Sequence, residues 1–240
     1  MRFEKTEVWG FEYALRGMRN PMNSWDKSDS YYETMYENDL EDINCSHIRP
    51  RFIIGPNDMK LAKQLIKAGS EHRKWMRQVF VSVDITAPMY WWNEFDIYKV
   101  GTVANSTSKM HKLASTPITM DCFEMGDFED TVLFMLDEDE LDDSIELSEL
   151  WKKLIKRLER MRVLYNETKD KRYWKEIIRL LPESWLQKRT ITMNYENVLN
   201  MYHQRCVHPH KLTEWSVSFK DWVESLPYAK QFFIEPFGKL

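Results

Sequence analysis

The chain has 240 residues, 43% of them hydrophobic, and carries 34 basic against 38 acidic side chains, a formal net charge of -4. This length and hydrophobic content predict one domain over residues 1–240 with a sizeable core. The acidic excess provides no broad positive field for phosphate backbones, so we expect no nucleic-acid partner. The first residues contain no apolar signal core, and no run approaches about 20 apolar residues, so we expect no membrane partner.

Cysteine and histidine usage argues against a metal centre. Cys45, Cys122 and Cys206 are odd in number and widely spread, which is typical of unreactive thiols in a reducing compartment. The three histidines at 203–210 lie near Cys206, but Pro209 interrupts their helical spacing, so we expect no metal site. These features predict a soluble, cytoplasmic protein, located in the host cytoplasm if the gene is viral.

The first half of the chain predicts a helix followed by a strand. Residues 56–69, PNDMKLAKQLIKAG, place apolar side chains at helical spacing; Asn57 or Asp58 can cap the start, and Gly69 can end the helix. Residues 79–85 then alternate valine or isoleucine with other residues, the two-residue period of a strand with one buried face.

The predicted strand leads into residues 87–100, APMYWWNEFDIYKV, where aromatic side chains stand beside acids and a lysine. Their periodicity mostly indicates core. On an extended strand, however, the adjacent Trp91 and Trp92 would point to opposite faces, so one could be buried while the other meets a ligand.

The second half is mainly helical. The acidic run DEDELDD is interpreted as a solvated loop leading into a helix rather than a metal or partner site. This run occupies residues 137–143. Four helices are expected after it, at residues 147–158, 173–178 (ended by Pro182), 193–205 and 213–225. The pattern predicts an α+β fold, helix-rich, with a central mixed or antiparallel sheet flanked by helices.

Several common catalytic signatures are missing from the sequence: it has no glycine-rich phosphate loop, no GxSxG elbow and no HExxH pair. No nucleophile and base are obvious as a pair. If the protein is an enzyme, a bound cofactor is therefore expected to supply the difficult chemistry.

The segment from Thr192 reads TMNYENVLNMYHQRCVHPHKLTEW and resembles the C-terminal signature of the flavin-dependent thymidylate synthases. In that family an asparagine opens a helix, and a second asparagine, an arginine, a histidine and a tryptophan follow. The matching residues here are Asn194, Asn200, Arg205, His208 or His210, and Trp215.

Asn194 and Arg205 would lie on one face of an unbroken helix, about 16 Å apart, which suits the two ends of a nucleotide. The alternative is structural: an asparagine satisfied by backbone and an arginine in a surface ion pair.

Three upstream segments extend the resemblance in the same order. RLLPESW resembles the family's segment leading into leucine-proline, with Arg179 one place from an expected phosphate-binding arginine. Residues 60–88 resemble the helix, loop and strand before the active segment. ALRGMRNPM, from Ala14, resembles the arginine-bearing N-terminal stretch. The matches therefore span most of the chain.

The family hallmark, arginine-histidine-arginine followed after seven residues by serine, falls on residues 87–108 and is largely replaced. Without a gap the triplet is Ile97, Tyr98 and Lys99 and the serine is Thr107; shifted by one, it is Tyr98, Lys99 and Val100 with Ser108. The loop ANSTSKMH keeps hydroxyl groups and backbone amides that can cradle a phosphate.

The resemblance assigns a role to each matching residue. Ser108 is the catalytic candidate. Candidates for FAD binding are Tyr98, Lys99, Asn194, Asn200 and His210. Candidates for substrate binding are Glu94, in place of a glutamine, with Ser106, Thr107, Lys109, Arg179 and Arg205.

The resemblance implies reductive methylation of dUMP, with methylenetetrahydrofolate as carbon donor and NADPH as hydride source through FAD, in a homotetramer. Three alternatives stay open. Glu94 favours C5 hydroxymethylation or alkylation of another pyrimidine nucleotide, because a carboxylate accepts from an amine-bearing base edge. The replaced triplet favours a non-catalytic nucleotide-binding protein without flavin. A helical interaction domain would make every motif match coincidental.

Overall fold

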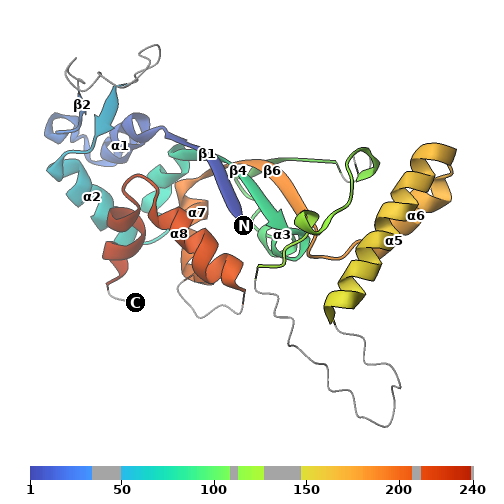
Figure 1. Cartoon of the computed structure of the whole chain (residues 1–240). Coiled ribbons are helices and arrows are strands. Elements are labelled where there is room, and N and C mark those ends of the chain that lie inside the picture. Colours follow the sequence, from blue (N-terminus) through green and yellow to red (C-terminus); the bar gives the residue numbers. More distant parts are fainter. Residues whose placement is uncertain (34–49, 109–112, 127–146, 207–211, 239–240) are drawn as a thin grey trace, which may run out of the picture. The chain divides into compact units, whose positions relative to one another are not determined.

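The computed structural model describes residues 1–33, 50–108, 113–126, 147–206 and 212–238 (Figure 1). Its strands are β1 Arg2–Trp9, β2 Tyr31–Glu33, β3 Arg51–Ile53, β4 Phe80–Pro88, β5 Val103–Ser106 and β6 Leu186–Asn194. Its α-helices are α1 Phe11–Arg19, α2 Pro56–Lys67, α3 Met89–Phe95, α5 Leu147–Thr168, α6 Lys171–Leu180, α7 Tyr195–Met201 and α8 Lys220–Glu224. A 3₁₀ helix spans Arg73–Gln78, and π-helical segments span Tyr202–Cys206, Glu214–Phe219 and Lys230–Ile234.

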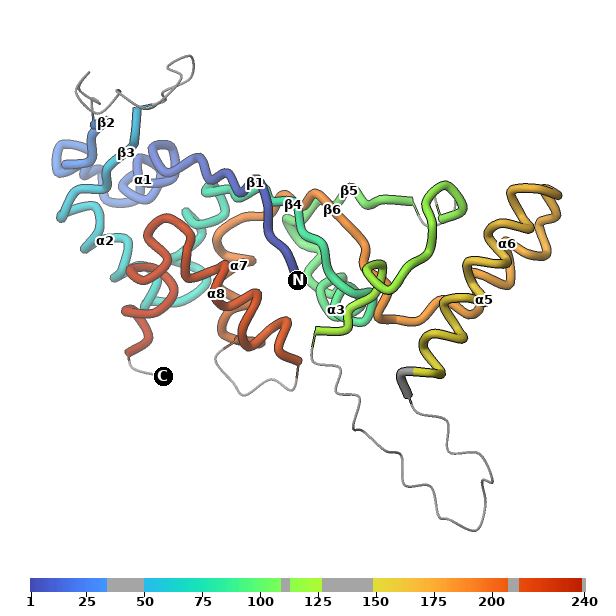
Figure 2. Tube along the Cα trace, viewed as in Figure 1, coloured from blue at the N-terminus to red at the C-terminus, as the bar shows by residue number. Residues whose placement is uncertain are grey.

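Four strands form an antiparallel sheet in the order β1-β4-β6-β5, and β2 and β3 form a separate hairpin (Figure 2). The hydroxyl of Thr190 donates to Asp84 at 2.6 Å, and that of Thr192 to Ser82 at 3.2 Å, which records the opposite directions of β4 and β6. The predicted α+β class, helix-rich with a central sheet, is confirmed.

Contacts within the chain divide it into two compact units. The larger unit comprises Phe3–Asp84, Tyr98–Ala104 and Thr190–Leu240; the smaller unit comprises Met1–Arg2, Ile85–Ile97 and Asn105–Arg189. The single domain expected over residues 1–240 stays a prediction.

The larger unit has an aromatic core. The ring of Phe11 packs edge-on against Tyr195 at 5.4 Å and near Phe232 at 6.4 Å, and both neighbours are fully buried. Gly10, between β1 and α1, has φ +98°, and a Cβ there would lie 2.3 Å from the carbonyl oxygen of Gln78. Only glycine fits both this conformation and this close approach.

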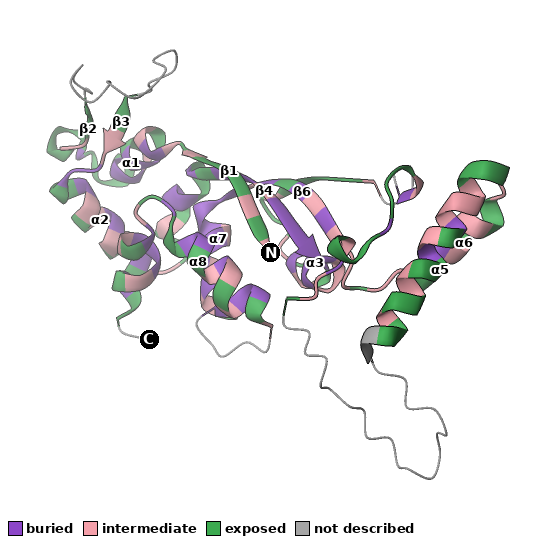
Figure 3. Cartoon of the chain, viewed as in Figure 1, coloured by how far each residue is buried: buried purple, intermediate pink, exposed green. Residues whose placement is uncertain are grey.

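The smaller unit buries its aliphatic core beneath a helical hairpin of α5 and α6. Leu158 and Ile177 are fully buried, and Phe123 packs edge-on against Trp185 at 5.5 Å. Figure 3 shows buried positions on these helices beside long exposed stretches, as expected of amphipathic helices. The helices predicted from the stripes at 147–158 and 173–178 are confirmed as α5 and α6.

The helix predicted at 56–69 and the strand predicted at 79–85 are also present, as α2 and β4. The predicted cap is wrong. Gly55 is the cap residue, and the carboxylate of Asp29 accepts from the backbone N–H groups of Asn57 and Asp58 at 2.8 and 3.1 Å. A side chain distant in sequence thus satisfies the orphan donors at the helix start.

The extended conformation expected for the two tryptophans is wrong, because the strand ends at Pro88 and α3 follows. Trp91 and Trp92 are both fully buried. The helix expected at 193–205 is present with shifted bounds and two geometries: β6 continues to Asn194, α7 spans Tyr195–Met201, and a π-helical segment spans Tyr202–Cys206. The helix predicted at 213–225 is also present, with π-helical geometry over Glu214–Phe219 and α-helical geometry over Lys220–Glu224.

The predicted acidic loop at 137–143 lies outside the described residues. Within the described ranges, no helix combines the length and the apolar character needed to cross a bilayer.

Candidate functional site

The loop that carries Tyr98 and Lys99 lies against the C-terminal helices inside the larger unit. Tyr98 is half-buried; its hydroxyl accepts from Nε of Arg205 at 3.1 Å and donates to Oε1 of Gln204 at 2.9 Å. The guanidinium of Arg205 lies 5.7 Å from the ring centroid of the buried Trp215. The fold therefore brings Tyr98, a candidate for FAD binding, into contact with Arg205, a candidate for substrate binding, and places Trp215 of the C-terminal signature beside Arg205; Tyr98 orients Arg205.

Two asparagines hold this loop in place. The side-chain oxygen of Asn194 accepts from the backbone N–H of Asn197 at 3.0 Å and so caps α7. The amide of Asn197 donates to the carbonyl of Val100 at 2.7 Å and to the hydroxyl of Thr102 at 3.0 Å. Asn194 thus caps α7 through its side-chain oxygen, and its assignment to FAD stays a prediction; Asn197 is a loop-holding residue that sequence reasoning missed.

The tip of the loop requires glycine. Gly101 has φ +74°, and a Cβ there would lie 2.7 Å from Nδ2 of Asn194 and 3.3 Å from Nδ2 of Asn197. Both amide groups therefore approach the backbone of the loop. The sequence did contain a signal for this arrangement: Asn194 and Asn197 are three positions apart, and positions three apart lie on the same face of a helix.

A second charged cluster surrounds the start of α7 and was also missed. The buried carboxylate of Glu196 pairs with Nε of Arg73 at 3.4 Å and with Arg77, while Arg73 donates to the side-chain oxygen of Asn200 at 3.1 Å. Glu71 also interacts electrostatically with Arg77, so the two guanidinium groups lie near two carboxylates. Asn200, assigned to FAD by resemblance, is held in this cluster.

The regular three-turn spacing expected between Asn194 and Arg205 does not hold. Asn194 precedes α7, and Arg205 lies in the π-helical segment Tyr202–Cys206, which changes the residues per turn. Tyr202 secures this segment by donating to Glu224 at 2.7 Å. Burial raises the pKa of the neighbouring Cys206 thiol to about 12, which makes it a poor nucleophile, as expected of an unreactive thiol.

The smaller unit contains the two tryptophans and the start of the hydroxyl-bearing loop. Trp92 donates from Nε1 to the carbonyl of Gln187 at 3.0 Å, and the guanidinium of Arg189 lies 4.2 Å from the Trp92 ring centroid. Arg189 also donates to Asp96 at 2.7 Å and to Gln187 at 3.0 Å. Trp92 is therefore core, with a buried arginine stacked on it, and Trp91 is buried as well.

The remaining assigned residues of the smaller unit are spread over several elements. Ser106 ends β5 and is exposed; the backbone of Thr107 donates to Lys188 at 3.0 Å and accepts from Gln187 at 2.7 Å. Ser108 follows and is half-buried, and Glu94 is half-buried on α3. The β6 strand thus fixes the start of the loop that resembles the family's nucleotide loop.

Arg179 pairs with Glu176, one turn earlier on α6, and more than half of its side chain is exposed. Lys109, His208 and His210 lie outside the described residues. Among the described residues, no group of three or more histidine, cysteine or acidic side chains is arranged to hold a metal ion.

The cluster around Tyr98 is suited to recognition rather than to nucleophilic attack. Arg205 and the exposed Lys99 are cations, and guanidinium and ammonium groups are the donors that phosphate oxygens accept most strongly. The half-buried phenol ring of Tyr98 contributes aromatic surface beside them, whereas the indole of Trp215 is fully buried.

Comparison with solved structures identifies the same fold in nucleotide-methylating enzymes. Thymidylate synthase X from Helicobacter pylori, solved with FAD and dUMP, aligns with a TM-score of 0.63 and 16% identity over 98% of this chain and 99% of that chain. A second structure of this enzyme with FAD and dUMP also gives 0.63, with 15% identity over 98% of each chain.

A UMP/dUMP methylase from Streptomyces cacaoi, bound with 5-Br UMP, aligns with a TM-score of 0.59 and 11% identity over 98% of this chain and 95% of that chain. No protein-family model matches the chain, and no curated protein matches it in sequence. The predicted resemblance to the flavin-dependent thymidylate synthases is thus confirmed at the level of the fold.

Proposed function

We propose that the protein is a divergent flavin-dependent thymidylate synthase-like enzyme. It binds a pyrimidine deoxynucleotide and FAD and methylates dUMP reductively, with methylenetetrahydrofolate and NADPH as co-substrates, in a homotetramer. The observation that carries this proposal is the fold shared over nearly the whole length of both chains with an enzyme solved with FAD and dUMP.

The arrangement of the loop and the C-terminal helices supports the proposal. The hallmark position and the C-terminal signature lie far apart in sequence, yet Tyr98 and Arg205 are in hydrogen-bond contact. Arg205 and Lys99 would neutralise phosphate, and bound FAD would supply the hydride-transfer chemistry. The role of this chain is then to bind and orient its ligands, which needs no protein nucleophile.

The fit to FAD is weaker than the family hallmark would provide. Ile97 stands exposed where the ungapped alignment expects a cation, and Lys99 is a point charge without the planar fork of arginine. Each missing charge-assisted hydrogen bond costs about 1.5–3 kcal/mol, or roughly one to two decades of affinity. We therefore expect FAD to bind, but to be lost during purification and restored by added FAD.

The test is to titrate purified protein with FAD by visible absorbance and with dUMP by calorimetry, and then to assay thymidylate formation with all four ligands. Arg205→Gln should weaken dUMP binding about tenfold or more. Arg157→Gln, the same change on the exposed surface of α5, is the control and should leave binding unchanged. Absence of both FAD and dUMP binding would refute the proposal.

A second candidate is a nucleotide-binding protein that has lost the flavin. It is favoured by the replaced triplet and by the hydroxyl of Tyr98, which is occupied by Arg205 and Gln204. This candidate predicts dUMP binding at full stoichiometry, no absorbance change on adding FAD at any concentration, and no turnover. Saturable FAD binding would eliminate it.

A third candidate, hydroxymethylation or alkylation at C5 of another pyrimidine nucleotide, is favoured by Glu94. An ionised carboxylate accepts hydrogen bonds and cannot donate them, so it would favour a donor-bearing base edge such as the amine of cytosine; it could also accept from N3–H of uracil. Calorimetry with dCMP and dUMP compares the two bases. Glu94→Gln should reverse a preference for dCMP, and equal affinities in the unaltered protein would count against this candidate.

A further inference from the structure

A pocket of about 380 Å³ lies in the N-terminal part of the larger unit, between α1, the segment after it and the β2–β3 hairpin. Its size falls in the range of small-molecule sites, about 300–1,000 Å³. Trp25, Tyr31, Tyr32 and Phe52 provide aromatic walls, and Arg16 lies on its rim. None of these residues has a role in the proposed nucleotide site.

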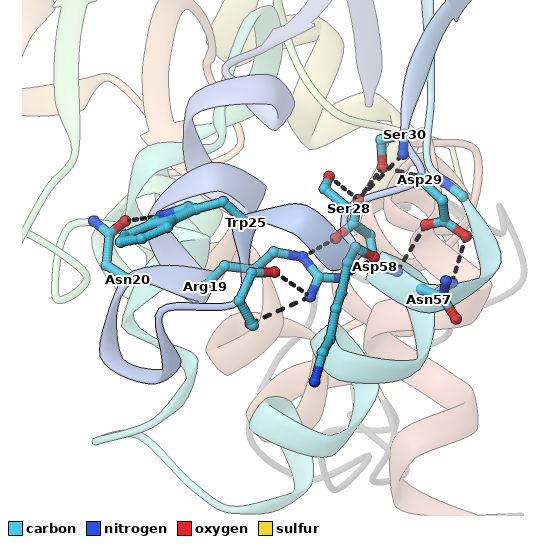
Figure 4. Close-up of polar contacts among 11 residues, drawn as sticks. Arg19, Asn20, Trp25, Ser28, Asp29, Ser30, Asn57 and Asp58 are labelled. Atoms are coloured by element: carbon cyan, nitrogen blue, oxygen red, sulfur yellow. Dashed lines mark hydrogen bonds and ion pairs between the residues drawn. The ribbon is translucent and has the colours of Figure 1, made fainter.

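The polar side that Arg19, Ser28 and Ser30 contribute to the pocket, here called its floor, is joined to Asp58 in one hydrogen-bond network (Figure 4). The buried guanidinium of Arg19 donates to Asp58 at 2.6 Å and to the carbonyls of Ser24 and Lys27 at 3.1 and 3.0 Å. The other carboxylate oxygen of Asp58 accepts from the hydroxyls of Ser28 and Ser30. Because these polar groups satisfy one another, a ligand gains little from the floor and must be recognised by walls and rim.

The aromatic walls are exposed but held in defined orientations. Trp25 is 51% exposed, and its Nε1 donates to the side-chain oxygen of Asn20 at 2.8 Å. Tyr32 is equally exposed; its hydroxyl donates to Glu12 at 2.7 Å, and its ring packs edge-on against Phe52 at 5.1 Å. Because these aromatic side chains are already ordered, they lose little conformational entropy when a ligand binds. Their flat surfaces favour stacking against a planar ring.

The rim carries the guanidinium of Arg16. The carboxylate of Glu12, four residues earlier on α1, also lines the pocket and accepts from the neutral hydroxyl of Tyr32. In the described part of the chain, Arg16 makes no ion pair with Glu12 or with any other carboxylate. Its guanidinium instead lies 5.4 Å from the ring centroid of Tyr13. A guanidinium in this position is complementary to a carboxylate or phosphate.

We propose that this pocket binds a small aromatic ring that carries an anionic group, with the ring between Trp25 and Tyr32 and the anion on Arg16. Ring carboxylates and ring phosphates share this chemistry. The proposal is independent of the dUMP and FAD site.

Two matched pairs of probes test it by ligand-observed NMR and calorimetry on the full chain: indole-3-acetate against indole-3-acetamide, and AMP against adenosine. In at least one pair the anion should bind about tenfold or more tightly than its neutral partner. The pair that binds identifies the carboxylate or the phosphate source. Arg16→Gln should abolish the preference for the anion, whereas Lys60→Gln, the same charge change on exposed α2, should keep it.

Trp25→Leu should weaken binding of both members of a pair, because the stacking surface is lost; Trp9→Leu, at a comparably exposed tryptophan, should not. Equal binding of anion and neutral partner would overturn the proposal, as would no binding of any probe. Dissociation of an oligomer by Trp25→Leu, seen by light scattering without any probe binding, would show that the aromatic walls contact a second copy of the chain instead.

Discussion

Replacing Tyr98 with phenylalanine removes one hydroxyl group and keeps the aromatic ring. The hydroxyl accepts from Nε of Arg205 at 3.1 Å and donates to Gln204 at 2.9 Å, so the change releases Arg205 from its orienting partner. If Arg205 binds the nucleotide phosphate, as proposed, the cost appears in the affinity for dUMP rather than in the fold.

The size of this effect follows from the contact. A hydrogen bond to a charged group contributes about 1.5–3 kcal/mol when well buried. Tyr98 is only half-buried, so we expect about 1–1.4 kcal/mol, or roughly 5- to 10-fold weaker dUMP binding. Arg205→Gln should cost more, because it removes the charge itself.

A double-mutant cycle measured by calorimetry tests the reasoning. In the Arg205→Gln background, Tyr98→Phe should change the affinity for dUMP very little, because the group it orients is already absent. Tyr165→Phe, on α5 in the smaller unit, is the matched control and should have no effect. The reasoning is refuted if Tyr98→Phe weakens binding equally in both backgrounds.

Three further predictions concern stability and FAD. Asp58→Asn should lower the free energy of unfolding by about 3–5 kcal/mol in urea denaturation, because it leaves a buried guanidinium unpaired. Burial raises the pKa of Asp58, but its hydrogen bonds to Ser30 and Ser28 and the guanidinium of Arg19 outweigh burial and lower the pKa. The stabilisation from Asp58 should therefore be present above about pH 4 and lost as the pH falls further. An unchanged acid transition in the variant would contradict this. Gly101→Ala should lower the melting temperature more than Gly69→Ala. Both glycines have positive φ, but only at position 101 would the new methyl group lie against Asn194. Equal shifts in melting temperature would exclude this contact. Ile97→Arg should strengthen FAD binding about tenfold in an absorbance titration, whereas Ile97→Gln should not, and equal affinities would argue against a phosphate near this position.

Local periodicity was sufficient to predict several elements. The alternation at 79–85 predicted β4, and the apolar stripes predicted α2, α5 and α6, because one buried face imposes a period of two or of 3.6 residues. The resemblance of collinear motifs predicted the fold, which the alignment with solved structures confirms.

Local patterns failed where distant residues decide the conformation. APMYWW contains strand-favouring aromatics, but α3 forms there because Trp92 is held by Gln187 and Arg189, which lie on β6. Likewise, α2 receives its cap from Asp29 rather than from its own first residues. Neither partner is visible within a local window of sequence.

The sequence by itself determined the class of fold, the main amphipathic elements and the replacement of the family hallmark. Tertiary structure decided what each polar residue does: Asn194 caps a helix, Trp91 and Trp92 are core, and Tyr98 orients Arg205. The physical reason is that burial patterns repeat along the chain, whereas a hydrogen bond joins atoms that only the folded chain brings within about 3 Å.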